Sequence, residues 1–117
     1  MGRVVYDSRW GKYHNKKIEV NGEKFDSTKE YSRWCELKML EKAGEIIGLT
    51  RQQRYELIPS QKVDGKVVER PVYYVADFCY IENGNPVVED CKGIKTDVYI
   101  IKRKLMLYVY GIVIRET

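Results

Sequence analysis

A hairpin signal in the second half of the chain fixes the relative position of two aspartates. Asn83 and Gly84 lie between two apolar runs, and Asn-Gly in this setting is the strongest short-range indication of a two-residue turn. A turn centred there pairs positions whose numbers sum to 167, so that Asp77 faces Asp90. Paired side chains have Cβ atoms about 5 Å apart. Two like charges at that separation are unfavourable unless something positive lies between them.

Lys92 supplies a positive charge to this pair. It follows Asp90 by two residues, so in an extended strand it points to the same face. Two carboxylates and an ammonium group then converge, which favours a site for a hard divalent cation and a phosphate. A three-residue loop would instead shift the register by one and make Glu89 the facing acid. The simpler alternative is an exposed edge hairpin with scattered charges.

Size and composition limit what else the chain can be. A length of 117 residues, with 44% apolar and 32% charged side chains, is typical of one soluble domain. There is no apolar run of about 18 residues and no signal-peptide core, which predicts a cytoplasmic protein without a membrane span. Three cysteines without metal-ligand spacing and a single histidine predict reduced thiols and no zinc site.

The net charge of +4 is concentrated at the N-terminus. Residues 1–17 contain five basic side chains and one acid, interleaved with aromatic residues, while the rest of the chain balances to zero. This combination suits a nucleic-acid contact, although a solubilising tail or an arm docked on the core has the same composition. Gln52 and Gln53 either contact a nucleic-acid backbone or close a turn. The N-terminal residues that we expect to contact DNA are Arg9, Lys12, Lys16 and Lys17.

Turn and cap signals predict the order of the elements. One helix begins after the Ser27 capping box and runs to about Ala43, and a second covers residues 97–110 after a Thr96 cap. A strand, a helix and a final strand of this length form a right-handed crossover with parallel strands. The expected fold is an α/β sandwich with a mixed sheet. The expected strands cover residues 18–20, 24–25, 46–49, 55–58, 72–81, 87–92 and 112–114.

Each predicted helix has an apolar stripe. In the first helix, Glu30 lies one turn before Trp34 on the stripe, so it can bond back to the helix cap, serve a second, inward-facing role, or do both. Lys102 falls within the stripe of the second helix, where its ammonium group either extends to the rim or reaches a phosphate near the carboxylates. The face of the second helix that we expect to pack on the core contains Val98, Ile101, Leu105, Tyr108 and Val109.

The acids and the lysine occur in an order that resembles the PD-(D/E)XK nuclease superfamily. The pattern is an acid at a helix start, then Asp, about a dozen residues, an acid, one spacer and Lys. The matching residues are Glu30, Asp77, Asp90, Cys91 and Lys92. The resemblance covers residues 25–115 and implies a restriction-endonuclease-like α/β core, in which a helix, an antiparallel β-meander, a helix and a strand build a mixed sheet flanked by helices. Ala76 departs from the pattern, because the superfamily's name has Pro there.

Several short phrases also look like a family of small, largely uncharacterised phage proteins placed in this superfamily and related to Holliday junction resolvase-like endonucleases. These phrases are residues 12–17, 25–27, 74–78 and 89–93. The resemblance implies a basic aromatic N-terminal arm and small hairpin over residues 1–24 and a single nuclease-like domain over residues 25–117. It also implies the cytoplasm of a bacterial host as the location.

The resemblance and the local chemistry imply an Mg²⁺-dependent endodeoxyribonuclease. Asp77 and Asp90 would hold Mg²⁺ or Mn²⁺, with the backbone carbonyl of Cys91 as a third ligand. Glu30 would bind directly or through a water molecule. The ion would polarise the scissile phosphate and acidify a water, while Lys92 would orient or help to deprotonate that water, or stabilise the pentavalent phosphate. Hydrolysis would leave a 5′-phosphate and a 3′-hydroxyl, and the Cys91 side chain would face the core.

The substrate expected from this pattern is branched DNA. Few residues lie outside the core to read a base sequence, so selection by backbone shape fits better, and cutting two strands symmetrically requires a homodimer. Gln53 and Lys102 are further candidate DNA contacts, and no organic cofactor is expected. One alternative is a non-catalytic DNA-binding or recombination accessory protein in which the acids form a metal-free salt-bridge cluster. Another is a nuclease for unbranched or single-stranded DNA.

Overall fold

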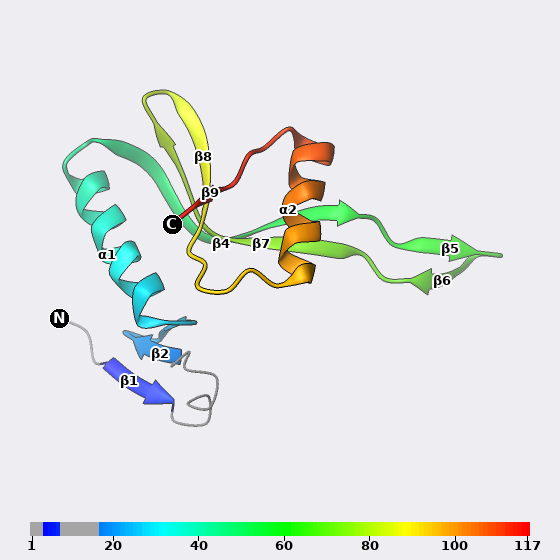
Figure 1. Ribbon diagram of the computed structural model, residues 1–117, viewed down its shortest axis with the longest axis horizontal. Coiled ribbons are helices and arrows are strands. Elements are labelled where there is room, and N and C mark those ends of the chain that lie inside the picture. The colour runs from blue at the N-terminus through cyan, green and yellow to red at the C-terminus, as the bar shows by residue number, and fades with distance from the viewer. Residues whose placement is uncertain (1–3, 8–16) are drawn as a thin grey trace.

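The computed structural model describes residues 4–7 and 17–117 and has a mixed α/β architecture (Figure 1). The described strands form three sheets, with the orders β1-β2-β3, β4-β7-β8-β9 and β5-β6. In chain order, the elements are β1 Val4–Asp7, β2 Lys17–Val20, β3 Glu23–Phe25, α1 Thr28–Lys42, β4 Ile46–Ile58, β5 Gln61–Val63, β6 Lys66–Glu69, β7 Val72–Glu82, β8 Asn85–Asp90, α2 Asp97–Tyr110 and β9 Arg115–Glu116.

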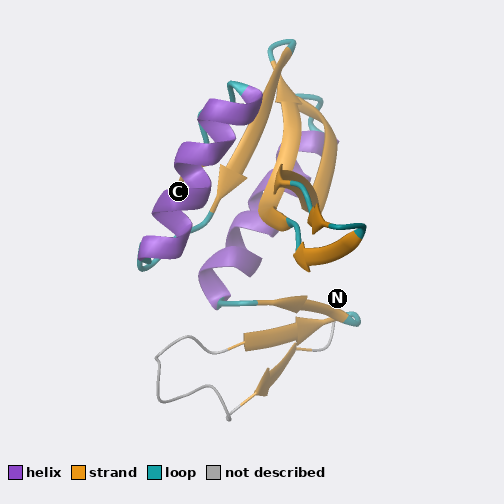
Figure 2. Ribbon diagram, turned by 90° about the vertical axis from the view of Figure 1, so that its right-hand side faces the viewer, coloured by secondary structure: helices purple, strands orange, loops and turns teal. Residues whose placement is uncertain are grey.

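The sheet β4-β7-β8-β9 is the centre of the molecule, and the two helices cover its opposite faces (Figure 2). On one face, Leu37 of α1 packs with Phe78. On the other, Met106 and Tyr99 of α2 pack with Val88. The pairs β4–β7 and β7–β8 are antiparallel, whereas β8 and β9 are parallel. The predicted mixed sheet with a parallel crossover through the second helix is therefore confirmed.

The hairpin between β7 and β8 has the predicted register. Asn83 and Gly84 have φ values of 51° and 78°, the left-handed conformations that a tight two-residue hairpin turn requires. The ladder runs from Glu82↔Asn85 to Phe78↔Glu89, so paired positions sum to 167 as expected. A slip by one residue, which would have exchanged the faces of the acids on β8, does not occur.

Strand β7 changes the face that it presents to each helix at Asp77. Residues two apart in a regular strand share a face, yet Tyr74 and Ala76 belong to the α2 side whereas Phe78 belongs to the α1 side. The facing strand is irregular at the same place. Gln52, whose neighbours on β4 pair with the neighbours of Asp77, has a left-handed φ of 59°. Asp77 therefore lies at the point where the two faces of β7 exchange sides.

Several boundaries differ from the prediction, among them the end of β8, which stops at Asp90 and not at Lys92. Residues 46–58 form one strand instead of two, because β4 accommodates Gly48 (φ 68°) at a register shift and Gln52 in left-handed conformation without ending. The final strand begins at Arg115, where pairing with β8 starts, and not at Ile112. The division expected between the N-terminal arm and the nuclease-like domain, between residues 24 and 25, falls inside β3. Phe25 of β3 packs against α1 together with β2.

The second helix presents a different face to the core from the one predicted. Tyr99 and Met106 are its buried residues, and Tyr110 donates a hydrogen bond to the carbonyl of Glu56 (2.6 Å). These contacts fix the rotation of α2 about its axis. Of the five apolar residues expected inside, only Leu105 packs against the core as a half-buried side chain. The residues that are exposed instead are Val98, Ile101, Tyr108 and Val109.

A buried ion pair joins α1 to the sheet. Glu89 is fully buried and receives two hydrogen bonds from Arg33, at 2.7 and 2.9 Å. Tyr80 donates a third at 2.6 Å, and Thr117 a fourth at 3.2 Å. Burial opposes ionisation of Glu89, but these donors together hold its pKa below the ordinary value. The carboxylate is therefore charged and fully used as an acceptor.

Removing the guanidinium from this pair is expected to destabilise the fold strongly. Arg33→Met leaves a buried carboxylate without its main partner, which costs about 3–5 kcal/mol. Urea unfolding at pH 7 measures the loss, with Lys42→Met in the exposed last turn of α1 as the matched control. The deficit should shrink as the pH falls below about 4.5, because the wild-type protein loses this stabilisation as Glu89 is protonated through its lowered pKa. Equal stability of the two variants would contradict this role for Arg33.

Candidate functional site

Asp90 is a buried carboxylate with one oxygen that accepts no hydrogen bond. Tyr74 donates its hydroxyl to Asp90 Oδ2, and Lys92 Nζ lies 3.2 Å from Oδ1. That approach does not have hydrogen-bond geometry, and Oδ1 has no hydrogen-bond partner among the described residues. Only 1% of Asp90 is exposed. A buried acceptor in this condition is rare in native proteins and indicates a place where a ligand, ion or water binds.

Asp77 lies beside Asp90 at the end of the β7–β8 ladder. Its Oδ2 accepts the main-chain N–H of Cys91 at 2.8 Å, which takes the place of a further ladder bond. Burial, followed by the charges of Asp90 and Glu30, raises the pKa of Asp77 to about 8. The hydrogen bond from the Cys91 N–H and the charge of Lys92 lower the pKa of Asp77 and so offset part of this rise. The predicted convergence of Asp77, Asp90 and Lys92 is therefore present, and it disfavours two ionised aspartates without added positive charge.

Glu30 is turned inward at the start of α1, as its position in the sequence predicted. Its main-chain N–H donates to Ser27 Oγ at 3.1 Å, and its Oε2 accepts the N–H of Asp26 at 2.9 Å. Its Oε1 lies 3.5 Å from Arg51 Nη2. Burial raises the pKa of Glu30, although these donors counteract the shift. Both carboxylate oxygens are engaged, so the helix-cap role is real and the role as a metal ligand stays a prediction.

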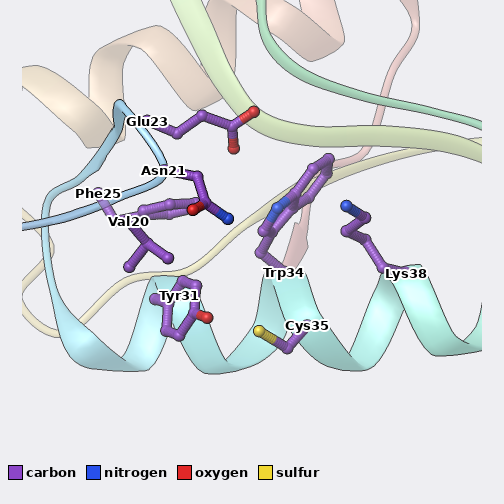
Figure 3. A pocket seen from close by; sticks show the side chains of 8 residues that line it. All are labelled: Val20, Asn21, Glu23, Phe25, Tyr31, Trp34, Cys35 and Lys38. Carbon is purple, nitrogen blue, oxygen red and sulfur yellow. The ribbon is translucent and has the colours of Figure 1, made fainter. Parts of the chain in front are cut away.

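Arg51 connects Glu30 to a neighbouring cavity. Its guanidinium lies 3.8 Å from the ring centre of Phe25 and 5.5 Å from that of Trp34, and it donates to the carbonyl of Lys24 at 2.8 Å. Phe25 and Trp34 are also walls of a cavity of about 140 Å³ between the N-terminal sheet and α1 (Figure 3). Arg51 thus neutralises Glu30 while it holds the aromatic wall in place.

Lys92 is held on the opposite side of the site by α2 and the C-terminal strand. Its ammonium group lies 4.6 Å from the ring centre of Tyr99, whose hydroxyl donates to Glu116 at 2.7 Å. The Lys92 N–H donates to the carbonyl of Thr117, and the Thr117 N–H donates to the carbonyl of Asp90. Because these contacts bracket Lys92, its side chain stays near Asp90.

The remaining predicted residues are distributed more widely. Arg9, Lys12 and Lys16 lie outside the described residues. Lys17 begins β2, with its Nζ 3.8 Å from Asp26. Gln53 is exposed within β4 and does not close a turn, and Lys102 is half-buried on α2 without a contact to the acids in the described part of the chain.

Cys91 and Glu89, the two sequence neighbours of Asp90, both lie on the α1 side of the sheet. Cys91 packs on the α1 side, so its thiol belongs to the core as expected. Glu89 faces α1 and is occupied by Arg33, which leaves Asp90 as the acid opposite Asp77.

The donors fit a divalent cation in part. Asp77 and Asp90 supply carboxylate oxygens, one of which accepts no hydrogen bond, and this is the ligand type that Mg²⁺ and Mn²⁺ prefer. Among residues 17–117 and 4–7, no group of three or more His, Cys, Asp or Glu side chains is placed to hold a metal ion. A cation here would therefore depend on the two aspartates together with carbonyl and water oxygens.

Sequence reasoning missed three residues of the site. Tyr74 lies three positions before Asp77 and would face the other way in a regular strand, so only the reversal of β7 places it against Asp90. Arg51 lies in a segment that was expected to lie between two strands. Tyr99 had a usable signal, because an aromatic residue at the third position of the second helix lies only seven residues after Lys92.

Sequence comparison assigns the chain to a family without assigning it an activity. Residues 10–115 match the family described as "Protein of unknown function (DUF1064)", and the chain belongs to that family. No curated protein and no solved structure matches it significantly. Within the described residues, neither helix has the length and apolar character needed to cross a membrane.

Neutralising Asp77 is expected to stabilise the metal-free protein at alkaline pH. Its pKa is about 8 in the folded state and 3.8 in an unfolded chain, so folding stability falls as the pH rises between these values. Asp77→Asn removes this dependence while its amide oxygen still accepts the Cys91 N–H. We expect a gain on the order of 2 kcal/mol at pH 8.5 that narrows towards pH 4.5, measured by urea unfolding in EDTA. Asp64→Asn in the exposed β5–β6 turn is the control, and a destabilised Asp77→Asn at pH 8.5 would refute the assignment.

Proposed function

We propose that this protein is a metal-dependent DNA endonuclease with a restriction-endonuclease-like core, selective for branched DNA of the Holliday junction type. The observation that carries the proposal is the pairing of Asp77 with Asp90 beside Lys92, in which a buried carboxylate oxygen of Asp90 lacks a hydrogen-bond partner. Lys92 Nζ lies 3.2 Å from that oxygen without hydrogen-bonding to it, whereas both oxygens of Glu89 accept hydrogen bonds. A phosphodiester-cleaving site needs such an oxygen for its cation.

The order of the elements supports the same proposal. An acid at the start of α1 precedes an antiparallel meander, a second helix and a strand parallel to β8, as in the nuclease superfamily that the sequence resembles. The reversal of β7 at Asp77 brings one acid to the end of the ladder, where β8 delivers Asp90 and then Lys92. The resemblance and the packing thus converge on the same residues.

The chain's own groups have distinct roles in the proposed reaction. Asp77 and Asp90 would hold Mg²⁺ or Mn²⁺, and the bound ion would polarise the scissile phosphate and acidify a water. Lys92, kept in place by the ring of Tyr99, would orient the attacking water or stabilise charge on the phosphate. Tyr74 would hold Asp90 in position through its hydroxyl. Glu30 would act from the helix cap, with Arg51 balancing its charge.

The charge of the N-terminal segment and the symmetry of branched DNA support the proposed substrate and assembly. The basic residues of the N-terminal segment suit contacts with phosphates, which position a protein on DNA without reading its sequence. Branched DNA offers two equivalent strands, so a homodimer with two sites would cut both. Activity in phage DNA recombination or processing, in the cytoplasm of a bacterial host, is the setting that the resemblance implies.

One observation also favours a second function, that of a protein without catalytic activity. Tyr74 and Lys92 already approach both oxygens of Asp90, and no three-acid cluster is present in the described residues. A non-catalytic DNA-binding or recombination accessory protein could keep such a cluster without a cation. A nuclease for unbranched or single-stranded DNA keeps the chemistry and changes only the substrate.

Cleavage assays separate these possibilities. Labelled four-way junctions, flaps, duplexes and single strands are incubated with Mg²⁺, Mn²⁺ or EDTA, and we expect metal-dependent paired nicks in the junction. Asp90→Asn should abolish cleavage, and Lys92→Gln should slow it by about 10²–10³-fold, because a group that stabilises the transition state is lost. Asp64→Asn, in a turn remote from the site, should cut at the wild-type rate.

Metal binding is tested without DNA. An ion that binds only the folded protein raises its stability, by about 2.7 kcal/mol at 100 times the dissociation constant. Mn²⁺ should therefore raise the melting temperature of the wild type and of Asp64→Asn, but not that of Asp90→Asn. Tight junction binding with neither cleavage nor a Mn²⁺ effect would favour the accessory protein, whereas cleavage of unbranched DNA alone would reject the junction specificity.

A further inference from the structure

The outward face of α2 is strongly apolar. Val98 and Ile101 are 62% and 57% exposed, and Tyr108 is 88% exposed. Ile94, just before the helix, is 75% exposed. Val98, Ile101 and Tyr108 lie on the side of the helix that does not contain Tyr99 and Met106, which are buried against the sheet. A helix that is apolar on two sides is normally covered on both.

The spacing of these residues is that of a helix–helix seam. Val98, Ile101, Leu105 and Tyr108 follow each other at intervals of three, four and three residues, which is the a/d repeat of packed helices. The buried residues Tyr99 and Met106 fall outside this repeat. The helix therefore carries one apolar stripe for its own core and a second stripe with its own regular spacing, and the half-buried Leu105 lies at the border between them.

The area of this face corresponds to the low end of what a specific interface buries. The exposed parts of Ile94, Val98, Ile101 and Tyr108 amount to roughly 600 Å², compared with about 800 Å² per partner in a standard protein–protein interface. Isolated monomers rarely leave a larger apolar patch open to water. Neighbouring polar side chains such as Lys104 would supply the rim of such an interface.

We propose that this face of α2 is the interface through which two copies of the chain form a two-fold dimer. A two-fold axis pairs one patch with itself, so a self-complementary apolar stripe is sufficient and no second surface is required. Nucleic acid is a poor occupant, because the stripe itself is uncharged and phosphates need basic contacts. The described strands β2 and β3 pack on α1, on the opposite face of the central sheet from α2.

The dimer gives the proposed nuclease its second site. Asp97 begins α2 five residues after Lys92, and Tyr99 of the same helix contacts the Lys92 ammonium. Pairing through α2 therefore joins the two candidate sites through short connections. This consequence rests on the proposed function, whereas the dimer itself does not.

Sedimentation equilibrium of the full chain, without DNA or metal, tests the interface. We expect a dimer at micromolar concentrations that persists in 1 M NaCl, since apolar contacts are not screened by salt. Ile101→Glu should raise the dissociation constant at least 100-fold while its circular dichroism spectrum and melting profile stay those of a folded protein. Tyr108→Lys is a second disruptive variant. Val67→Glu, an equally exposed apolar site on β6, is the matched control and should leave the dimer intact.

Each other occupant gives a distinct result that overturns the proposal. A wild-type monomer at 100 µM would assign the face to a different protein. A monomer whose melting temperature falls in Ile101→Glu would mean that the chain's own segment covers the face. A dimer that survives both α2 variants would place the interface elsewhere. If the protein dimerises as expected but cuts no DNA, the proposed function fails and the interface stands. If it cuts junctions, Ile101→Glu should convert paired cuts into single nicks.

Discussion

Two consecutive carboxylates buried at the end of β8 are the constraint on which the rest of the structure depends. Glu89 and Asp90 point to opposite faces of the sheet, and each is almost completely removed from water. Burying one ionised carboxylate costs several kcal/mol unless partners replace the water. Arg33 of α1 is the partner of Glu89 on one face, and Tyr74 and Lys92 are the partners of Asp90 on the other. Both helices are thereby tied to the same two residues.

The two carboxylates differ in how completely they are satisfied, and this difference separates structure from function. Glu89 accepts hydrogen bonds from four donors, which keeps it charged and fixes α1. Asp90 has one hydroxyl donor, an ammonium group outside hydrogen-bond geometry, and a second acid beside it. The C-terminal strand contacts both, since Thr117 donates its hydroxyl to Glu89 and its N–H to the carbonyl of Asp90. Movement of that strand would therefore disturb the structural pair and the candidate site together.

The sequence predicted the parts of this arrangement that depend on local rules. The Asn83 turn fixed the hairpin register, and with it the faces of Asp77 and Asp90, because a two-residue turn leaves one alignment. The contact between Tyr74 and Asp90 was not predictable, since it requires β7 to reverse its face opposite a left-handed Gln52. That backbone conformation is set by tertiary packing, and glutamine has no local preference for it.

The error over α2 has a physical cause that bears on assembly. Hydrophobic periodicity records which residues avoid water, and it does not distinguish burial in the chain's own core from burial against a second molecule. The stripe with the clearest spacing was assigned to the core, whereas Tyr99 and Met106 occupy that position. Tyr99 also contacts the Lys92 ammonium group and donates a hydrogen bond to Glu116 from that position. If the regular stripe is buried in a dimer, the periodicity identified a real contact surface and only its partner was misassigned.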